Sequence, residues 1–273
     1  MLRGFLLLLI TVSQSYAYHT TNVLLKQIEQ LCSETPYCHT PAPSHIFIHG
    51  NDPHTALNMF VFGEHARELI SSEIGLELVR TLSTRRPTKS YLIIPVLNDW
   101  GRRRAETVNP CLRVNENGVD LNRNYPTQGK RDMKPGNTYA GPYPFSEKET
   151  RMVKHLLETH SVHTFVSIHS GDLAMYLPWD GSIHTPPHYQ TAMHKVNVLK
   201  RRFCPKCVVG PAAKVSSYKC YGTAVDYVME YNLAQYAFTF EVWNSSSGDC
   251  FKRFNPIETA ETVKQWVSIL RNI

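Results

Sequence analysis

Residues 58–82 read NMFVFGEHARELISSEIGLELVRTL, and this stretch decides the class of fold. Its opening run, 58–62, is apolar and has the length and composition of a buried strand. From residue 68 onward the apolar residues recur at helical spacing, which predicts a helix over 68–82. Because a strand that passes directly into a helix is the repeating unit of α/β domains, the stretch predicts that class of fold.

The same alternation continues along the chain. Apolar, β-rich runs predict further strands, and stretches with a helical period predict further helices. Ser146 and Glu149 have the spacing of a capping box at the start of one such helix. We therefore expect a single three-layer α/β/α domain, in which a mixed and mostly buried β-sheet is flanked by helices. The strands are expected at 45–49, 58–62, 91–97, 164–169 and 236–242, and the helices at 68–82, 146–160, 187–203, 222–231 and 256–271.

The composition is that of an ordinary globular domain. The chain has 273 residues, of which 42% are hydrophobic and 19% charged, which excludes disordered and collagen-like chains. The net charge of +6 is small and its basic residues are scattered, so we expect no nucleic-acid partner. No apolar run reaches the roughly 18 residues of a spanning helix, so we expect no membrane span.

The first seventeen residues are typical of a signal peptide. Arg3 gives a basic start, 5–12 an apolar core, and the stretch Ser15 to Ala17 a small-x-small cleavage site. The apolar core is too short for a membrane anchor. We therefore expect residues 1–17 to be removed, with no long propeptide after them. The remaining chain, 18–273, would be secreted or reside in the lumen of the secretory pathway, extracellular, vacuolar or lysosomal.

Secretion determines how the seven cysteines are interpreted. In the cytosol, Cys204 and Cys207 would suggest a redox pair or half of a zinc site. In an oxidising compartment structural disulfides are favoured. Cys32 and Cys38 could close a local loop, whereas the other pairings stay open. The odd number leaves at least one thiol free or paired with another chain.

Three strand ends carry residues with metal and proton chemistry. His65 and Glu68 follow the strand at 58–62, and His169 ends the strand at 164–169. Each has a plain structural alternative, such as a rim histidine or an acid in the first turn of a helix. Together, two imidazoles and one carboxylate would leave a zinc position open for water. Glu241 ends another apolar run, where burial would raise its pKa and suit it to accept a proton.

The irregular stretch over 98–143 is polar and contains GVDLNRNYP at 118–126. Long irregular segments in compact domains tend to be functional. Asn122 and Arg123 offer an amide beside a forked guanidinium, which suits the binding of a carboxylate. A metal site beside a carboxylate clamp would be suited to cutting the last residue from a peptide.

Five motifs together resemble the zinc metallocarboxypeptidases, the family that includes pancreatic carboxypeptidases A and B and the N/E-type enzymes. They occur in the family's order over almost all of 18–273, which is therefore expected to be one catalytic domain. The stretch 113–126 looks closer to the N/E branch. The motifs are GEHARE (63–68), GVDLNRNYP (118–126), GPYPFSEKE (141–149), IHS (168–170) and FTFE (238–241).

The resemblance implies roles for individual residues. One zinc ion would be held by His65, Glu68 and His169, and Glu241 would be the general base for attack by water. Further residues would bind substrate or stabilise the oxyanion. Arg113 would stabilise the oxyanion; Arg102, Arg103 and Arg104 are alternatives for this role, although three successive arginines are more often a solvated surface patch. Asn122 and Arg123 would bind the terminal carboxylate, and Tyr218 (or Tyr221) would close over the substrate. Arg67 would contact residues further upstream in the substrate.

The resemblance also places Val225 at the base of the side-chain pocket. Thr239, Ala213 and Ser217 would be uncharged walls, which favours hydrophobic or aromatic C-terminal residues. A shift of one position would bring Asp226 into the pocket instead, and Asp172 could supply a charge by another route.

The sequence thus predicts a zinc carboxypeptidase of the secretory pathway that acts, as a monomer, on peptide or protein C-termini. One alternative is a related metallopeptidase that acts on cell-wall peptides. Another is a zinc-binding family member without catalysis, although the ligands, the base and the clamp are all present.

Overall fold

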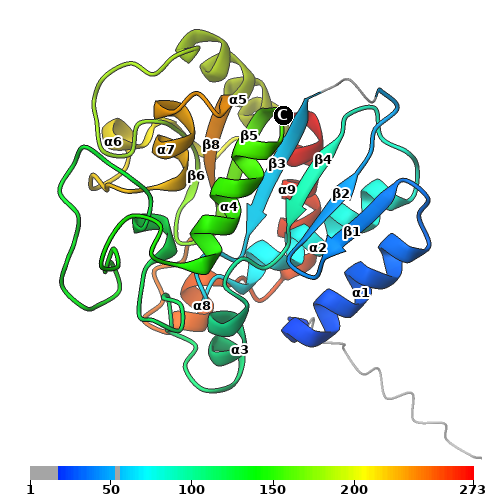
Figure 1. Cartoon of the computed structure of the whole chain (residues 1–273), viewed down its shortest axis with the longest axis horizontal. Coiled ribbons are helices and arrows are strands. Elements are labelled where there is room, and N and C mark those ends of the chain that lie inside the picture. The colour runs from blue at the N-terminus through cyan, green and yellow to red at the C-terminus, as the bar shows by residue number, and fades with distance from the viewer. Residues whose placement is uncertain (1–17, 53–55) are drawn as a thin grey trace, which may run out of the picture.

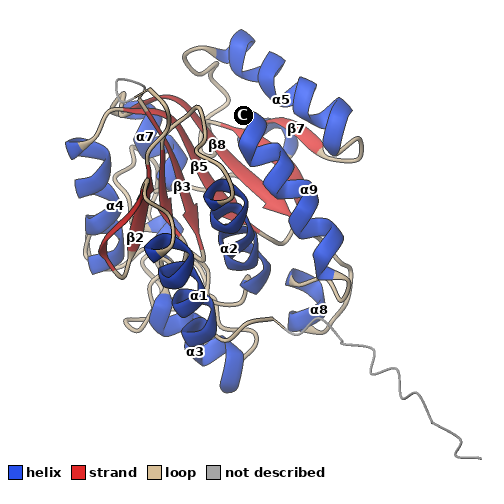
Figure 2. Cartoon of the chain, turned by 90° about the vertical axis from the view of Figure 1, so that its right-hand side faces the viewer, coloured by secondary structure: helices blue, strands red, loops and turns tan. Residues whose placement is uncertain are grey.

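The computed structural model describes residues 18–52 and 56–273. The predicted signal peptide and its cleavage site lie outside these residues. Figures 1 and 2 show a central sheet with helices on both faces, so the expected α/β/α class is confirmed.

Among the described residues the sheet has eight strands, in the order β1-β2-β4-β3-β5-β8-β6-β7. Its centre, β4-β3-β5-β8, is parallel, and antiparallel pairs flank it on both sides. From β3 the chain continues to β4 on one side, whereas β5 pairs with the other side of β3. The strands are β1 Cys38–Ala42, β2 His45–Ile48, β3 Leu57–Phe62, β4 Tyr91–Ile94, β5 Val162–His169, β6 Leu173–Leu177, β7 Val208–Pro211 and β8 Ala234–Val242.

Two apolar cores separate the sheet from its helices. Helices α1, α2, α5 and α9 bury their apolar residues on one face, around Trp266, and α4 and α7 cover the other face, around Phe165. Among the described residues no helix is long and apolar enough to cross a membrane. The helices are α1 Thr21–Ser33, α2 Leu69–Ser83, α3 Asp99–Thr107, the short η1 Leu121–Arg123, α4 Lys148–Thr159, α5 Tyr189–Phe203, α6 Ala212–Val215, α7 Ala224–Glu230, α8 Cys250–Phe254 and α9 Thr259–Asn272.

All five predicted strands and all five predicted helices are present, but the sequence missed the internal strand β6 and the peripheral elements. The edge strands β1 and β7 are short and partly exposed, so they lack a clear apolar run. Helix α3 lies within the stretch that was expected to be irregular. The capping box is wrong: Glu147 is the N-cap of α4, and the Ser146 hydroxyl donates to Glu147 Oε1 at 2.6 Å.

The described part of the chain forms three disulfides, which link Cys32 to Cys38, Cys111 to Cys250, and Cys204 to Cys207. The predicted local loop is confirmed, and Cys204 and Cys207 are paired with each other rather than free to bind a metal. Within the described chain Cys220 is the free thiol.

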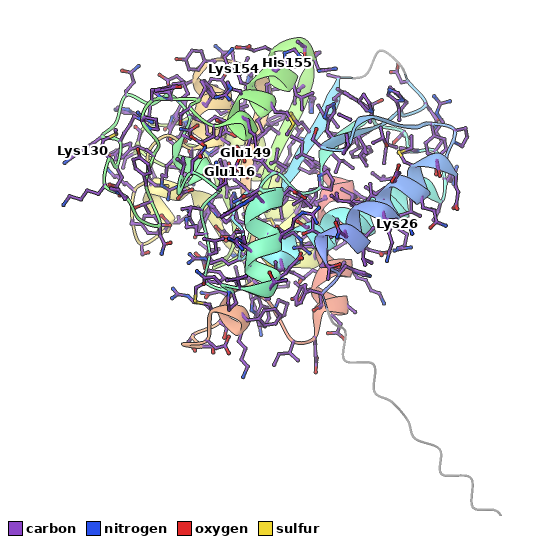
Figure 3. All side chains as sticks on the ribbon, turned by 60° about the horizontal axis from the view of Figure 1, so that its bottom comes forward. Lys26, Glu116, Lys130, Glu149, Lys154 and His155 are labelled. Carbon is purple, nitrogen blue, oxygen red and sulfur yellow. A yellow bond between two sulfur atoms is a disulfide. The ribbon has the colours of Figure 1, made fainter. Side chains whose placement is uncertain are left out.

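Charged side chains of both signs are distributed around the surface. Lys26 on α1, Lys130 on a long loop and Lys154 on α4 lie on separate parts of the molecule (Figure 3). Lys154 pairs with Glu158 at 2.5 Å and Lys148 with Glu116 at 2.6 Å, both at exposed positions.

Candidate active site

The turn after β3 presents two of the predicted metal donors. β3 ends at Phe62, and Gly63 follows with φ +66°, a conformation that favours glycine. His65 and Glu68 lie in the turn that follows, and Glu68 is the N-cap of α2 without capping the helix through its side chain. Its carboxylate is therefore free to point at the two histidines.

The third donor and the predicted base are neighbours across two strands. In the parallel pair β5 and β8, His169 is in register with Glu241 and Ser167 with Thr239. Because side chains alternate along a strand, all four point to the same face of the sheet. This face meets the turn after β3 at the carboxyl ends of the strands, where open α/β sheets commonly bind ligands.

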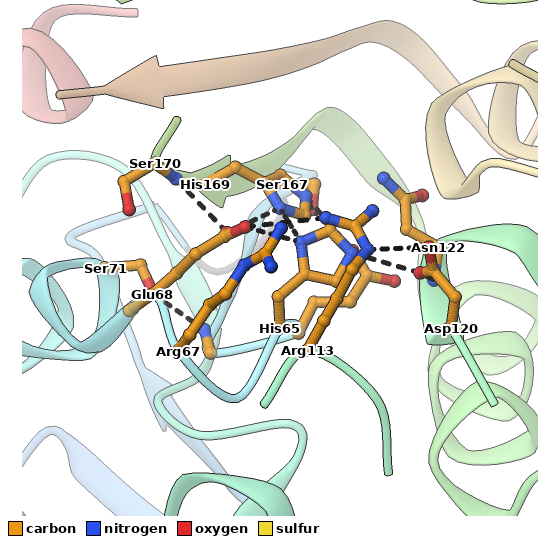
Figure 4. Close-up of polar contacts among 12 residues, drawn as sticks. His65, Arg67, Glu68, Ser71, Arg113, Asp120, Asn122, Ser167, His169 and Ser170 are labelled. Carbon is orange, nitrogen blue, oxygen red and sulfur yellow. Dashed lines mark hydrogen bonds and ion pairs between the residues drawn. The ribbon is translucent and has the colours of Figure 1, made fainter. Parts of the chain in front are cut away.

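The donor atoms of the three residues converge in a buried cluster (Figure 4). Glu68 Oε1 lies 2.8 Å from His65 Nδ1, and Glu68 Oε2 lies 3.1 Å from His169 Nδ1. The two Nδ1 atoms are 3.1 Å apart. Each of the three residues is less than 5% exposed.

The remaining ring nitrogens face hydrogen-bond acceptors. His65 Nε2 is 3.1 Å from Asp120 Oδ1, and His169 Nε2 is 2.7 Å from Ser167 Oγ and 3.2 Å from Glu64 Oε2. These contacts favour a proton on each Nε2, which leaves the Nδ1 lone pairs directed at one point. Two imidazoles and a carboxylate so arranged fit one zinc ion with a coordination position to spare.

The carboxylates also set the electrostatics of the cluster. Burial lowers the pKa of His169, but its contacts with Glu64 and Glu68 outweigh burial and raise the pKa well above its ordinary value. Burial raises the pKa of Glu68, but His65 and His169 hold it below the ordinary range. The cluster therefore has a strong affinity for positive charge.

Arg113 reaches this cluster, whereas the rival arginines do not. Arg113 Nε donates to Asp120 Oδ2 at 2.8 Å, and its Nη1 lies 3.8 Å from Glu68 Oε1. Arg102 is buried elsewhere and donates to the carbonyl of Leu69 at 3.0 Å, so its assignment to a solvated patch is wrong. Arg103 and Arg104 are also engaged outside the cavity, with Asp99 and with the ring of Trp100, respectively.

The cluster opens into a cavity of about 380 Å³. The predicted binding residues that line it come from five separate segments, which the fold brings together. They are Arg67, Arg113, Asn122, Arg123, Tyr218, Thr239 and Glu241.

Hydrogen bonds on the side away from the cavity fix Asn122 and Arg123, the predicted carboxylate clamp. Asp120 caps η1 and accepts from the backbone N–H of Asn122 at 3.0 Å. Asn122 Oδ1 accepts from the N–H of Ala224 at 2.9 Å, which ties the clamp to α7. Burial lowers the pKa of Arg123, but nearby Asp120 outweighs burial and raises it, so the guanidinium stays charged.

Glu241 has the environment that was expected from its strand end. Its side chain is partly exposed to the cavity, but Oε2 is buried and has no hydrogen-bond partner. Burial raises the pKa of Glu241 to about 7. Thr239 Oγ1, on the same face of β8, is likewise buried without a partner.

The side-chain pocket differs from the predicted one. Val225, on α7, is buried in the core and does not line the cavity, and neither does Ala213. Asp180, which follows β6, lines it instead, and its Oδ1 is buried without a hydrogen-bond partner. Asp226 lies behind Asp180 and accepts from its backbone N–H at 2.8 Å.

The other predicted pocket residues divide in the same way. Ser217 and Asp172 line the cavity, and Asp172 accepts a hydrogen bond from Tyr176. Tyr218 is 63% exposed and stands at the rim of the cavity. The ring of its rival, Tyr221, packs closely against Gly129 and Gly181 and is not part of the cavity wall.

Four polar residues that support the site were missed by sequence reasoning. Glu64 and Asp120 lie inside the recognised motifs, and their burial was the missing information. Asp180 follows a strand that was not predicted. Asn255 accepts from the N–H of Ile70 at 3.0 Å and donates to the carbonyl of Arg67 at 2.9 Å, so it holds the turn around Glu68 from a distant part of the chain.

Comparisons with known proteins identify relatives of this chain. Mast cell carboxypeptidase A of Rattus norvegicus is 28% identical over 171 residues, which is 56% of this chain and 41% of that protein. The chain thus spans about two fifths of the length of this relative.

Two solved structures share the fold. Bovine thrombin-activatable fibrinolysis inhibitor, solved with a tick carboxypeptidase inhibitor, matches 94% of this chain and 96% of its own at a TM-score of 0.80 and 20% identity. The murein-tripeptide amidase MpaA of Escherichia coli O157 matches 83% and 84% at a TM-score of 0.55 and 21% identity. The profile of the zinc carboxypeptidase family matches residues 51–264, and we conclude that the chain belongs to this family of metallo-exopeptidases.

Proposed function

We propose that this protein removes the last residue from peptides or proteins by hydrolysis. One observation carries the proposal: Asn122 and Arg123 share a cavity with Glu241 and with the cluster around His65. A fixed guanidinium and amide are suited to a free carboxylate, so they would select a chain end. The peptide bond next to that end would then lie against the metal cluster.

His65, Glu68 and His169 would hold one zinc ion, which would act as a Lewis acid towards water and the scissile carbonyl. Glu241 would accept the proton of the attacking water and deliver it to the nitrogen of the departing residue. Its pKa near 7 allows both transfers near neutral pH. Arg113 points into the cavity and would donate to the oxygen on which negative charge develops.

Two further residues would complete substrate binding. Tyr218 stands exposed at the rim, and we propose that it closes over the terminal residue. Arg67 lies over the ring of Phe254, 4.1 Å from its centroid, and lines the cavity, where it would contact residues upstream of the cut.

The preferred terminal side chain depends on the cavity wall. The expected hydrophobic preference rested on Val225, which does not reach the wall. Asp180 does reach it, with a buried oxygen that has no partner. Since a buried carboxylate oxygen without a partner is costly, a cationic side chain would fit this wall better than an apolar one. We therefore propose a preference for C-terminal Lys or Arg.

The three disulfides support the proposed passage through the secretory pathway, because disulfides persist in oxidising compartments. We propose that the protein acts there as a monomer.

The test is a peptide library that differs only in its last residue, with free and amidated C-termini. We expect cleavage of the free peptides alone, with release of one residue and the highest kcat/KM for Lys and Arg. Equal cleavage of amidated peptides would exclude the exopeptidase proposal. Higher rates for Phe or Leu would exclude Asp180 as the selecting residue. A muropeptide included in the library would reveal the cell-wall alternative if it were cleaved faster than every ordinary peptide.

A further inference from the structure

Glu64 is a buried acid that the proposed reaction does not use. It precedes His65 in the turn after β3, and its side chain is fully buried. Its Oε2 lies 3.2 Å from His169 Nε2 and accepts a hydrogen bond from Ser167 Oγ at 3.0 Å. Its Oε1 is buried without a hydrogen-bond partner. A buried carboxylate with an oxygen that lacks a hydrogen bond costs free energy, so its presence here calls for an explanation.

A contrast with Asp120 suggests the reason. Both acids lie behind a histidine of the cluster, Asp120 behind His65 and Glu64 behind His169. The charge of Asp120 is balanced by Arg113, whose Nε is 2.8 Å away. Throughout 18–52 and 56–273 no lysine or arginine forms an ion pair with Glu64, which has the ring of His169 instead.

The hydrogen bonds at Nε2 restrict how His169 can be used. Because Ser167 donates its proton to Glu64, Ser167 Oγ is left to accept from Nε2–H at 2.7 Å. A bare nitrogen lone pair at Nε2 would face oxygen lone pairs on both neighbours. The proton is thereby kept on Nε2, and the Nδ1 lone pair stays directed at the cluster.

We propose that Glu64 is a positioning residue that orients His169 for the metal and strengthens the bond of its Nδ1 to zinc. A negative partner at Nε2 makes the imidazole a stronger donor at Nδ1, and the buried charge of Glu64 is in turn balanced by the divalent ion. This inference rests on the proposed zinc site, but it adds a residue that acts through a ligand rather than on the substrate.

The test compares zinc affinity in wild type and E64Q, measured by competition with a chromophoric chelator. Glutamine keeps the size of the side chain and an oxygen that can accept from Ser167, but it removes the charge. We expect zinc binding about 10- to 100-fold weaker in E64Q. A role in packing alone would leave zinc affinity unchanged in E64Q, because glutamine fills the same space and still accepts from Ser167.

E149Q is the matched control, since Glu149 is a largely buried acid on α4 (Figure 3), where its Oε2 accepts from Asn115 at 3.4 Å. It should bind zinc as wild type does. H65A should bind zinc far more weakly than either. A wild type that binds no zinc would overturn the proposed function together with this inference. Equal zinc affinity in wild type and E64Q would overturn this inference alone.

A second variant keeps the inference testable if E64Q does not fold. S167A leaves Glu64 in place but removes the hydroxyl that accepts from Nε2–H. We expect zinc affinity to fall at least about threefold in S167A, less than in E64Q. Zinc affinity unchanged in S167A would then overturn the inference.

Discussion

The two sides of the active-site cavity differ in how far their polar atoms are satisfied. On the metal side, both ring nitrogens of His65 and His169 and both oxygens of Glu68 have polar partners within 3.2 Å, whereas the Oε1 atom of Glu64, behind His169, has none. On the substrate side, the buried atoms Glu241 Oε2, Thr239 Oγ1 and Asp180 Oδ1 have none.

This difference indicates what each side does. Buried polar atoms are nearly always paired, so a group of unpaired ones marks a place where a ligand supplies the partners. The metal side is fixed in advance by its own contacts, whereas the substrate side is completed by the peptide. Variants of the metal side should therefore change metal affinity, and variants of the substrate side should change rates while the metal is kept.

The largest effect is expected for E241Q, which tests that separation directly. Removing the proton acceptor should lower kcat by about 10³- to 10⁴-fold. Zinc content, measured by atomic absorption after dialysis, should stay at one ion per chain, because Glu241 is not part of the cluster. Loss of zinc from E241Q would break the comparison, and near-normal kcat would refute the mechanism.

Arg113 contacts both sides of the cavity, so R113A should change both the reaction rate and zinc affinity. Loss of its donor to the oxyanion should lower kcat by about 10²- to 10³-fold. Because Arg113 also balances the charge of Asp120 at 2.8 Å, zinc affinity should change as well, by less than about tenfold. Steady-state kinetics with saturating zinc, beside chelator competition, would separate the two effects. A change in zinc affinity alone would remove Arg113 from the reaction.

The fold class, the family and the convergence of His65, Glu68 and His169 could be predicted because several signals, each weak alone, occur in a consistent order along the chain. Apolar runs marked the central strands, and their carboxyl ends placed His65, His169 and Glu241 at one edge of the sheet. Parallel pairing then brings these strand ends together whatever the loops do.

What the sequence could not predict depended on packing at a distance. Counting along the chain put Val225 in the pocket, but it cannot tell which side of α7 faces the cavity, and Val225 faces the core. Asp180 lies after a strand that was not predicted. Glu64 was visible beside His65, yet its partner is His169, on another strand. The roles proposed for Asp180 and Glu64 follow from their burial and their contacts in the fold, which the sequence does not show.

D180N sharpens the comparison on the substrate side alone. If Asp180 binds a cationic side chain, kcat/KM for C-terminal Lys and Arg should fall about 100-fold, because the variant leaves that charge buried without a counter-charge. Peptides that end in Phe or Leu should be cleaved about as before, and zinc affinity should not change. An equal fall for all substrates would show that Asp180 supports the fold of the cavity rather than selecting the side chain.

The last expected effect concerns stability rather than rate, and it uses the unpaired oxygen of Glu241. Burial raises the pKa of Glu241 to about 7, above the value of about 4.3 in an unfolded chain. A raised pKa in the folded state gives stability that is fully present below the unfolded value and is lost as pH rises through about 7. In zinc-free protein, wild type should therefore lose about 1–2 kcal/mol relative to E241Q between pH 5 and pH 8, a range reduced by the partial exposure of this side chain. Urea unfolding of both proteins at the two pH values measures the difference. If wild type and E241Q lost the same free energy of unfolding between pH 5 and pH 8, the Glu241 carboxylate would be as well solvated in the folded chain as in the unfolded one. The two sides of the cavity would then not differ as described.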